Sequence, residues 1–164
     1  MYLKTIYQSP LGPMSLVASD RGLRGAWFEG QKYFELGLAE STLLGSHPIL
    51  DQTILLLDAY FSGEEVDFSS LTLEAIGTEF QEKVWALLKV IPHGQTISYG
   101  QLAQQLGLQS GQAIGGAVGR NPYSVIVPCH RVLNQKGQLT GYAGGLDKKI
   151  WLLQHENPYF EVKQ

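Results

Sequence analysis

Residues 96–119 read TISYGQLAQQLGLQSGQAIGGAVG, and the arrangement expected of the C-terminal half follows from this stretch. Ser98 is a good N-cap for a helix over Tyr99–Leu106, and Gly107 suits its C-terminal end. A second short helix is expected to begin at residue 110 or 111 and to end near 119. Two short helices joined by a tight turn are typical of a helix-turn-helix, although plain helical hairpins share the spacing. The positions that would pack the pair together are Leu102, Ala103 and Leu106.

The second of these helices is rich in small residues and offers few side chains that could probe base edges in a major groove. Small residues let a backbone approach another surface closely, so the helix suits a minor groove, where shape and phosphates are read. The alternative is that these residues pack against a neighbouring helix. The small positions are Gly111, Ala113, Gly115, Gly116, Ala117 and Gly119.

Helical periodicity extends on both sides of this stretch. Over residues 78–91 an apolar position recurs every third or fourth residue, and Pro92-His93-Gly94 ends the helix. A last helix is expected over Asp147–His155. The apolar faces of these two helices consist of Phe80, Val84, Leu87, Leu88 and Ile91, and of Ile150, Trp151, Leu152 and Leu153.

The N-terminal third has a different pattern, in which short apolar runs alternate with Pro- and Gly-rich turns. Strands are expected over Tyr2–Tyr7, Met14–Ala18 and Leu23–Phe28, which together predict an antiparallel meander. A helix over residues 48–62 follows, with Gly63 as its cap, and residues 64–78 read as a connector. The sequence therefore predicts an α+β protein with two domains, 1–76 and 77–164.

The composition excludes several classes of protein. Among 164 residues there is one cysteine, so neither an internal disulfide nor a four-cysteine zinc site can form. No apolar stretch is long enough to cross a bilayer and no export signal is seen, so we expect a cytoplasmic protein with a reduced thiol. The net charge of −3 is unevenly divided: residues 1–78 carry −6 and residues 79–164 carry +3. A modestly basic half suits phosphate binding, although ordinary scatter of charge is an alternative.

The single cysteine lies in the run VIVPCHRV, residues 125–132, where a strand-like apolar segment leads to Pro128-Cys129-His130-Arg131. Only the thiolate of a cysteine is a strong nucleophile, and a neighbouring imidazole can accept the proton if a third group orients its ring. His130 and Arg131 supply a nitrogen base and a positive charge, and Glu156 could orient the imidazole. The alternative is a buried cysteine that acts as a small apolar side chain.

The sequence resembles the O6-alkylguanine-DNA alkyltransferases, also called methylated-DNA–protein-cysteine methyltransferases. The resemblance rests on motifs that follow one another in order between Phe80 and Glu156. They are Ile97-Ser98-Tyr99-Gly100-Gln101-Leu102-Ala103, Asn121-Pro122, Pro128-Cys129-His130-Arg131-Val132, Gly141-Tyr142-Ala143-Gly144-Gly145-Leu146 and Trp151-Leu152-Leu153-Gln154-His155-Glu156. The resemblance implies an N-terminal ribonuclease H-like domain and a C-terminal winged-helix or helix-turn-helix domain.

The resemblance also implies a reaction, which is the repair of O6-alkylguanine in double-stranded DNA, with repair of O4-alkylthymine left open. The alkylated base is flipped out of the duplex, and its alkyl group is transferred irreversibly to Cys129, so that each molecule acts once. No cofactor and no metal are implied. DNA would be bound through its minor groove without sequence specificity, by a monomer.

Roles for individual residues follow from the same resemblance. Cys129 is the nucleophile, His130 its base through a water molecule, and Glu156 orients His130. Tyr99 would donate a hydrogen bond to the leaving guanine, and Asn121 would tie the second helix to the turn at Cys129. The expected substrate contacts are the carbonyl groups of Cys129 and Val132, the amide of Ala143, the side chain of Lys149, and Tyr142. For Lys149 a solvated helix charge is the alternative.

The second helix is expected to contact DNA through Gln112, Ala113, Gly115, Gly116 and Arg120. The family commonly has an arginine where this chain has Gln112, and that side chain enters the base stack in place of the flipped guanine. Glutamine is long enough to fill the gap but lacks the cation's attraction to phosphates, which Arg120 could partly restore.

Three other functions remain open on the sequence alone. A lesion-binding relative would recognise alkylguanine without accepting the alkyl group, but such proteins have another residue in place of Cys129. A helix-turn-helix transcription regulator with an inert cysteine is disfavoured by the glycine-rich second helix. A Cys-His-Glu hydrolase is disfavoured because the base directly follows the nucleophile and no oxyanion-hole motif is visible.

Overall fold

A computed structural model describes residues 1–38, 41–109 and 111–163. Contacts divide the chain into two compact units. The first contains Met1–Ile76 and Pro122–Ile126, and the second contains Gly77–Asn121 and Val127–Gln164. The stretch Pro122–Ile126 thus belongs with the first unit although it lies in the C-terminal half of the sequence.

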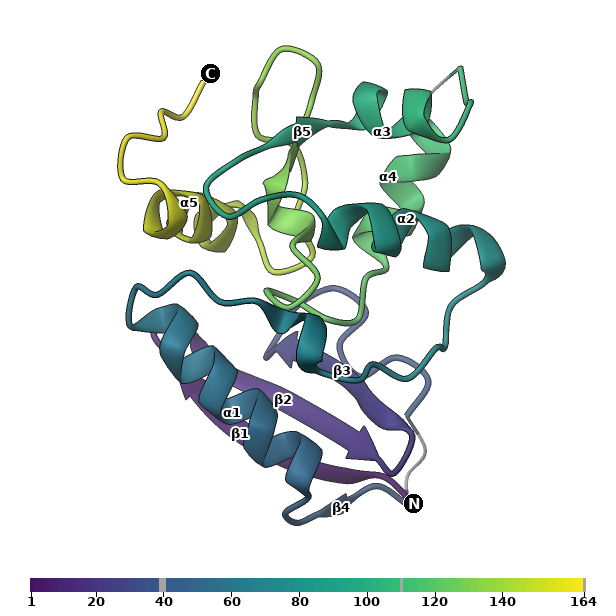
Figure 1. The fold of residues 1–164 in the computed structure, drawn as a ribbon, viewed down its shortest axis with the longest axis vertical. Coiled ribbons are helices and arrows are strands. Elements are labelled where there is room, and N and C mark those ends of the chain that lie inside the picture. The colour runs from purple at the N-terminus through teal and green to yellow at the C-terminus, as the bar shows by residue number, and fades with distance from the viewer. Residues whose placement is uncertain (39–40, 110, 164) are drawn as a thin grey trace. The chain divides into compact units, whose positions relative to one another are not determined.

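The first unit is built on a sheet with strand order β3-β2-β1-β4 (Figure 1). Its strands are β1 (Leu3–Ser9), β2 (Gly12–Ser19), β3 (Gly22–Phe28) and β4 (Leu43–Leu44). The first three form the expected antiparallel meander, which is confirmed, whereas the parallel edge strand β4 was not predicted. The expected helix is α1 (Pro48–Phe61), and Gly63 follows it with a φ of 106°. Within the predicted connector lies a single 3₁₀ turn, Phe68–Ser70.

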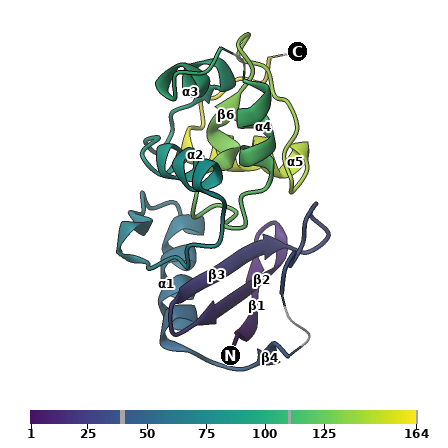
Figure 2. The same ribbon diagram turned by 90° about the vertical axis from the view of Figure 1, so that its right-hand side faces the viewer.

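Both faces of this sheet are covered, which explains why β3 is buried along its whole length. Helix α1 lies along one face (Figure 2), where the hydroxyl of Tyr7 donates to Asp58 over 2.7 Å. On the other face, Glu35 accepts hydrogen bonds from Lys4 and Ser15. Because alternate side chains of a strand point to opposite faces, this polar cluster and the α1 contacts come from different positions of the same strands.

The free edge of β3 is paired with two short segments from elsewhere in the unit. Leu23 exchanges backbone hydrogen bonds of 2.8 Å with Thr72 and Glu74. Further along the strand, Ala26 donates to Pro122 over 2.8 Å and accepts from Ser124 over 2.9 Å. An unpaired edge would leave backbone donors and acceptors exposed, so these segments complete the sheet.

The second unit is mainly helical, with α2 (Glu79–Lys89), α3 (Tyr99–Gln105), α4 (Gln112–Gly119) and α5 (Leu146–Glu156). Two strands of two residues each, β5 (Ile97–Ser98) and β6 (Val132–Leu133), pair in parallel. Capping boxes at Thr78 and Ser98 fix the starts of α2 and α3, because each hydroxyl accepts from the third backbone amide of its helix. The indole of Trp85 donates to the Ala117 carbonyl over 2.9 Å and ties α2 to α4.

These observations confirm the α+β class and the helix-turn-helix formed by α3 and α4. One local prediction is wrong: the apolar segment before Cys129 is not a strand. Residues 124–126 form a turn and Val127 a bend, and Val125 has a φ of 73°, a left-handed conformation that is strained for a β-branched residue. The apolar character of this segment reflects burial rather than extended structure, because Val125, Ile126 and Val127 are all buried.

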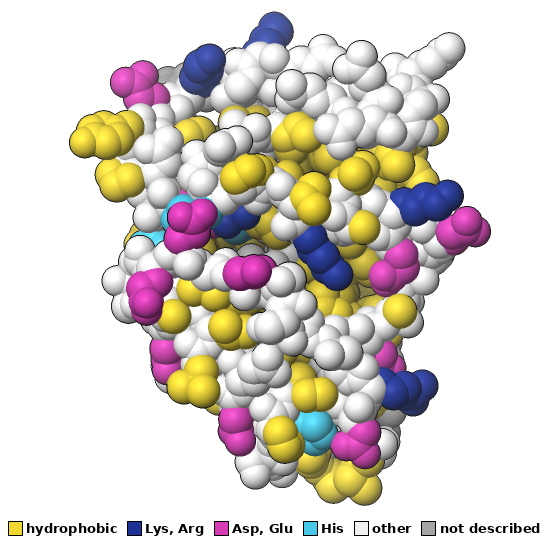
Figure 3. Space-filling model, viewed as in Figure 1, with side chains coloured by type: hydrophobic (Ala, Val, Ile, Leu, Met, Phe, Trp, Pro, Cys, Tyr) yellow, Lys and Arg dark blue, Asp and Glu magenta, His cyan; other side chains and the backbone are white. Residues whose placement is uncertain are grey.

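Charged side chains on the face drawn in Figure 3 are scattered singly or in small groups of mixed sign and do not form one large patch. None of the helices in the described parts of the chain is long and apolar enough to cross a membrane. In the same residues no group of three or more His, Cys, Asp or Glu side chains could hold a metal ion.

Candidate active site

Cys129 is held in a compact double turn. The amide of Cys129 donates to the carbonyl of Val127 over 2.7 Å around Pro128, whose φ and ψ of −79° and 65° are those of an inverse γ-turn. Cys129 then begins a single 3₁₀ turn, Cys129–Arg131. Proline suits the central position because its ring holds φ near −65°. The thiol is thereby fixed on a rigid backbone, with 5% of the residue exposed.

His130 and Glu156 form a buried pair beside this turn. Nε2 of His130 lies 2.6 Å from Oε2 of Glu156, and neither side chain is exposed. Burial alone would raise the pKa of the Glu156 carboxyl, but His130 and Arg131 outweigh it and hold that pKa well below its usual range. The ionised carboxylate can only accept, so Nε2 of His130 carries the hydrogen. Nδ1 is then the basic nitrogen, and it is buried with no hydrogen-bond partner among the described residues.

Arg131 supports Glu156 rather than the thiol. Its Nε and one terminal nitrogen donate to the two carboxylate oxygens over 2.7 and 2.9 Å, and the other terminal nitrogen donates to the Ile91 carbonyl over 2.6 Å. The expectation that Arg131 supplies charge to the cysteine is therefore wrong. Two-point pairing of this kind fixes the plane of the carboxylate, which in turn fixes the imidazole.

Burial sets the resting protonation states of Cys129 and His130. It raises the pKa of the Cys129 thiol, and the opposing effects of Asn121, Lys149 and Tyr142 are smaller. Burial also lowers the pKa of the His130 imidazole, although Glu156 acts in the opposite direction. At neutral pH the resting site consequently holds a neutral thiol and a neutral imidazole, which is a base ready to accept the thiol proton.

Lys149 lies on α5 but is completely buried. Its ammonium group donates to the carbonyl oxygens of Val132, Thr140 and Gly141, at 2.6, 3.0 and 3.5 Å. Burial lowers its pKa to about 8, so it is still charged at neutral pH. The alternative of a solvated helix charge is wrong. The three ammonium hydrogens are taken up by backbone carbonyls, and Lys149 thereby joins the segment after Cys129 to the loop before α5.

The remaining expected substrate contacts are backbone groups. The Cys129 carbonyl accepts from the amide of Val132, and the Val132 carbonyl accepts from Lys149, so each retains one lone pair for a ligand. Ala143 lies in a turn closed by a 2.9 Å hydrogen bond from Gly145 to Tyr142. The amide of Ala143 has no hydrogen-bond partner within the described chain.

Tyr99 and Asn121 connect the helix-turn-helix to this centre. The pairing of β5 with β6 aligns Ser98 with Leu133, so Tyr99 at the start of α3 lies next to the segment that follows Cys129. Burial raises the pKa of the Tyr99 phenol, and the side chain of Thr140 opposes this effect only in part. Asn121, directly after α4, donates through Nδ2 to the Val127 carbonyl over 2.8 Å. The neighbouring Thr140 was not singled out from the sequence, which carries no local signal for it.

The residues expected to contact DNA form a separate surface on α4. Gln112, Ala113, Gly116 and Arg120 are exposed and Gly115 is half-buried, whereas the opposite face is buried. A Cβ atom added at Gly115 would meet nothing within 4 Å, and at Gly116 it would meet only the end of the Arg120 side chain at 3.9 Å. These two glycines are therefore not required for packing inside the described part of the chain.

Comparisons with known proteins agree with this geometry. Two protein-family models match the chain. The family model described as 6-O-methylguanine DNA methyltransferase, DNA binding domain, matches residues 79–158, and the one described as 6-O-methylguanine DNA methyltransferase, ribonuclease-like domain, matches residues 2–75. A methylated-DNA–protein-cysteine methyltransferase of Mycobacterium leprae is 41% identical over 152 residues, which cover 90% of this chain and 88% of the relative. One from Methanosarcina acetivorans is 41% identical over 153 residues, covering 92% and 96%. The crystal structure of Mycobacterium tuberculosis OGT in complex with DNA superimposes with a TM-score of 0.83 at 36% identity, covering 96% of this chain and 92% of that one.

Proposed function

The chain belongs to the 6-O-methylguanine DNA methyltransferase family, and from this membership we propose that it repairs O6-alkylguanine in DNA by moving the alkyl group irreversibly to Cys129. The observation that carries the proposal is the buried relay of Glu156 and His130 next to the only thiol in the chain. A lesion-binding protein would need no such relay, which disfavours the alternative of recognition without transfer.

The relay accounts for the first half of the reaction. Glu156 holds the hydrogen of His130 on Nε2, so Nδ1 accepts the thiol proton through a bridging water molecule. The electron pair of the sulfur then forms the bond to the alkyl carbon while the bond from that carbon to O6 breaks. A thioether has no route back to the thiol, so each molecule reacts once and requires no cofactor. In the net reaction the cysteine loses a proton and gains the alkyl group, while the guanine loses the alkyl group and takes up a proton.

The leaving guanine needs stabilisation as charge develops on it, and the chain offers suitable groups. Tyr99 has a raised pKa, so it remains protonated and can donate a hydrogen bond to the base. The amide of Ala143 is a free donor for O6, and the carbonyls of Cys129 and Val132 can accept from the exocyclic amine. Tyr142 contributes at Cys129, where its hydroxyl lowers the pKa of the thiol. Lys149 positions the Val132 carbonyl and the loop near Ala143.

DNA is assigned to the exposed side of α4. The open space around Gly115 and Gly116 lets the helix backbone approach a minor groove, and this helix offers few side chains for reading bases, so binding is independent of sequence. Gln112 at the start of α4 fills the space left by the flipped base, and Arg120 at its end supplies a charge for phosphates. We assign the protein to the cytoplasm, since a free nucleophilic thiol needs a reducing compartment. We also assign it as a monomer.

The intact mass of the protein after incubation with duplex DNA containing O6-methylguanine tests this function. The expected result is a gain of one methyl group per molecule that is absent in Cys129→Ser. Tight binding without a gain in mass would replace the proposal by lesion recognition. Repeated turnover of an ester or a peptide would replace it by hydrolysis.

A further inference from the structure

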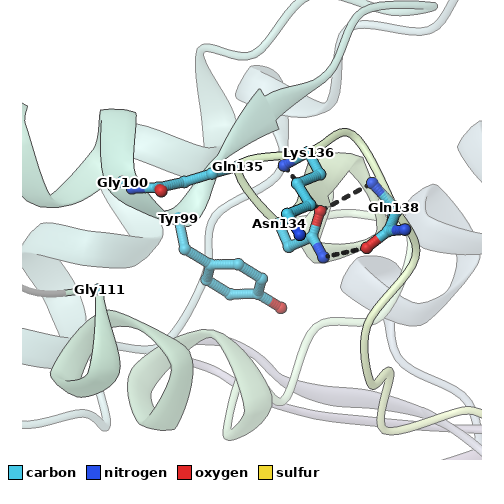
Figure 4. A pocket seen from close by; sticks show the side chains of 7 residues that line it. All are labelled: Tyr99, Gly100, Gly111, Asn134, Gln135, Lys136 and Gln138. Carbon is cyan, nitrogen blue, oxygen red and sulfur yellow. Dashed lines mark hydrogen bonds between the residues drawn. The ribbon is translucent and has the colours of Figure 1, made fainter.

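A cavity of about 410 Å³ lies between the start of α3 and the turn that follows β6. Figure 4 shows the ring of Tyr99 beside the side chains of the turn. Nothing in the proposed transfer reaction uses the turn residues, yet they make up more than half of the lining. The lining consists of Tyr99, Gly100, Gly111, Asn134, Gln135, Lys136 and Gln138.

The turn is held in a fixed shape by Asn134. Its side-chain oxygen accepts from the amides of Lys136 and Gln138 over 3.0 and 2.8 Å, and its Nδ2 donates to the Gln138 side chain over 3.0 Å. Gly137 has a φ of 74°, a conformation that glycine adopts without strain. Lys136 and Gln135 are consequently presented from a rigid backbone and not from a loose loop.

The cavity has the charge of an anion site. Lys136 is the single charged residue in its lining, and its ammonium group makes no hydrogen bond or ion pair with any described residue. The Gln135 side chain, which is also exposed, lies against Gly100, where an added Cβ would come within 2.6 Å of its amide nitrogen. An uncommitted ammonium beside an amide donor is the combination that binds a phosphate oxygen.

A neighbouring cavity of about 340 Å³ provides a contrast. It shares Asn134 and Gln135 with the first cavity but has no charged residue in its lining. The charge of Lys136 therefore distinguishes the first cavity from the second, and the first is also the one lined by Tyr99, the residue assigned to the guanine. A phosphate next to the flipped nucleotide must lie close to that base, because the two belong to the same nucleotide unit.

We propose that the cavity between Tyr99 and the Asn134–Gln138 turn binds a backbone phosphate that flanks the alkylated nucleotide, with Lys136 as its counter-charge and Gln135 as a donor. The inference rests on the proposed function, since it requires DNA to be bound with Tyr99 at the guanine. It assigns Lys136 to positioning of the strand and gives it no part in the transfer of the alkyl group.

Salt dependence of DNA binding tests the role of Lys136. Binding is measured in the Cys129→Ser background, so that the lesion is not repaired during the titration. Lys136→Ala should lower the magnitude of the slope of log K against log [salt] by about 1, which corresponds to one lost phosphate contact. Lys136→Arg should keep the slope, and so should Lys89→Ala, which removes an exposed charge at the end of α2.

Uncharged phosphate analogues locate the contact. A duplex with a single methylphosphonate on one side of the lesion should bind the Cys129→Ser protein more weakly, and the loss should be clearly smaller once Lys136→Ala is added, since only the Gln135 contact then remains. An unchanged salt slope in Lys136→Ala, or equal methylphosphonate losses with and without Lys136, would overturn the inference. If the parent protein itself gains no methyl group from the duplex, it is the proposed function that fails. Reaction with free O6-benzylguanine, which has no phosphate, should be unchanged in Lys136→Ala with Cys129 present.

Discussion

The imidazole of His130 donates from Nε2 to Oε2 of Glu156 across 2.6 Å, and both side chains are shielded completely from solvent. The two residues lie 26 positions apart in the sequence and meet because α5 packs against the 3₁₀ turn that begins at Cys129. Since the carboxylate is also paired with Arg131, it cannot rotate freely, and the imidazole keeps one tautomer. The tautomer determines which nitrogen can act as a base.

Glu156→Gln should slow alkyl transfer by about 100-fold or more, the range associated with loss of a general base. A glutamine amide can donate to Nε2 of His130, which would put the hydrogen on Nδ1 and remove the basic nitrogen from the thiol. The rate is measured in a single turnover with free O6-benzylguanine and with methylated duplex. Both substrates should be affected alike.

Loss of stability must be separated from loss of the base in this variant. Removing the charge leaves Arg131 buried without its carboxylate, so the free energy of unfolding should also fall by about 3–5 kcal/mol. Rates are therefore compared well below the unfolding midpoint of the variant. Glu161→Gln, an exposed position beyond α5, is the matched control and should behave like the parent protein. A folded Glu156→Gln protein with the parent rate would exclude the relay.

On the acid side of neutrality the rate of transfer should fall as the pH is lowered. Burial lowers the pKa of His130, so the imidazole is already unprotonated at the ordinary histidine pKa of about 6.5. A base works only when unprotonated, and the raised pKa of Cys129 keeps the thiol protonated over the same range. The rate with free O6-benzylguanine should be level from about pH 6.5 to 7.5, where Lys149 with its pKa of about 8 is still mostly charged, and should fall at lower pH. A rate that climbs steadily through neutrality would mean that His130 titrates as an ordinary surface histidine.

Lys149→Met should damage both the fold and the reaction, although Lys149 touches neither sulfur nor alkyl group in the proposed mechanism. Methionine fits the space but leaves the Val132 and Thr140 carbonyls without their donor, at a cost of about 1–3 kcal/mol in the free energy of unfolding. The Val132 carbonyl also loses its position, so transfer from free O6-benzylguanine should slow at least several-fold. Chemical denaturation and single-turnover rates measure the two effects. Lys148→Met is the control on the same helix, and equal behaviour of the two variants would show that Lys149 has no such role.

Local signals in the sequence were sufficient for most of the fold. The helix start at Ser98 could be predicted because a capping hydroxyl acts on amides within the same turn, and the helix that begins after Thr78 could be predicted from its apolar periodicity. Strands separated by Gly-containing turns likewise carry their pairing in the local pattern, and β1, β2 and β3 agree with it. Strand β4 escaped prediction because two exposed leucines have no periodicity, and only pairing with β1 makes them a strand.

The candidate site was predictable in its identities but less so in its contacts. Cys129 and His130 are adjacent in the chain, whereas the partners of Arg131 and Lys149 are backbone and carboxylate groups brought together by folding. A charged side chain in a sequence is expected to be solvated, so the burial of Lys149 had no signal. The run Val125-Ile126-Val127 has the composition of a strand, but hydrogen bonds of Pro122 and Ser124 to Ala26 set the preceding backbone and the run forms turns instead.

Gln112→Ala should separate the handling of DNA from the chemistry at Cys129. Gln112 is exposed at the first position of α4, away from the buried relay, and is assigned to the gap left by the flipped guanine. Alanine is too short to fill that gap, so the base stack would reclose more readily and repair of methylated duplex should slow by tenfold or more, because unstacking a base costs a few kcal/mol. Reaction with free O6-benzylguanine requires no base flipping and should keep its rate. Gln8→Ala, an exposed glutamine on β1, should leave both rates unchanged, and equal slowing of both substrates in Gln112→Ala would remove Gln112 from the flipping step.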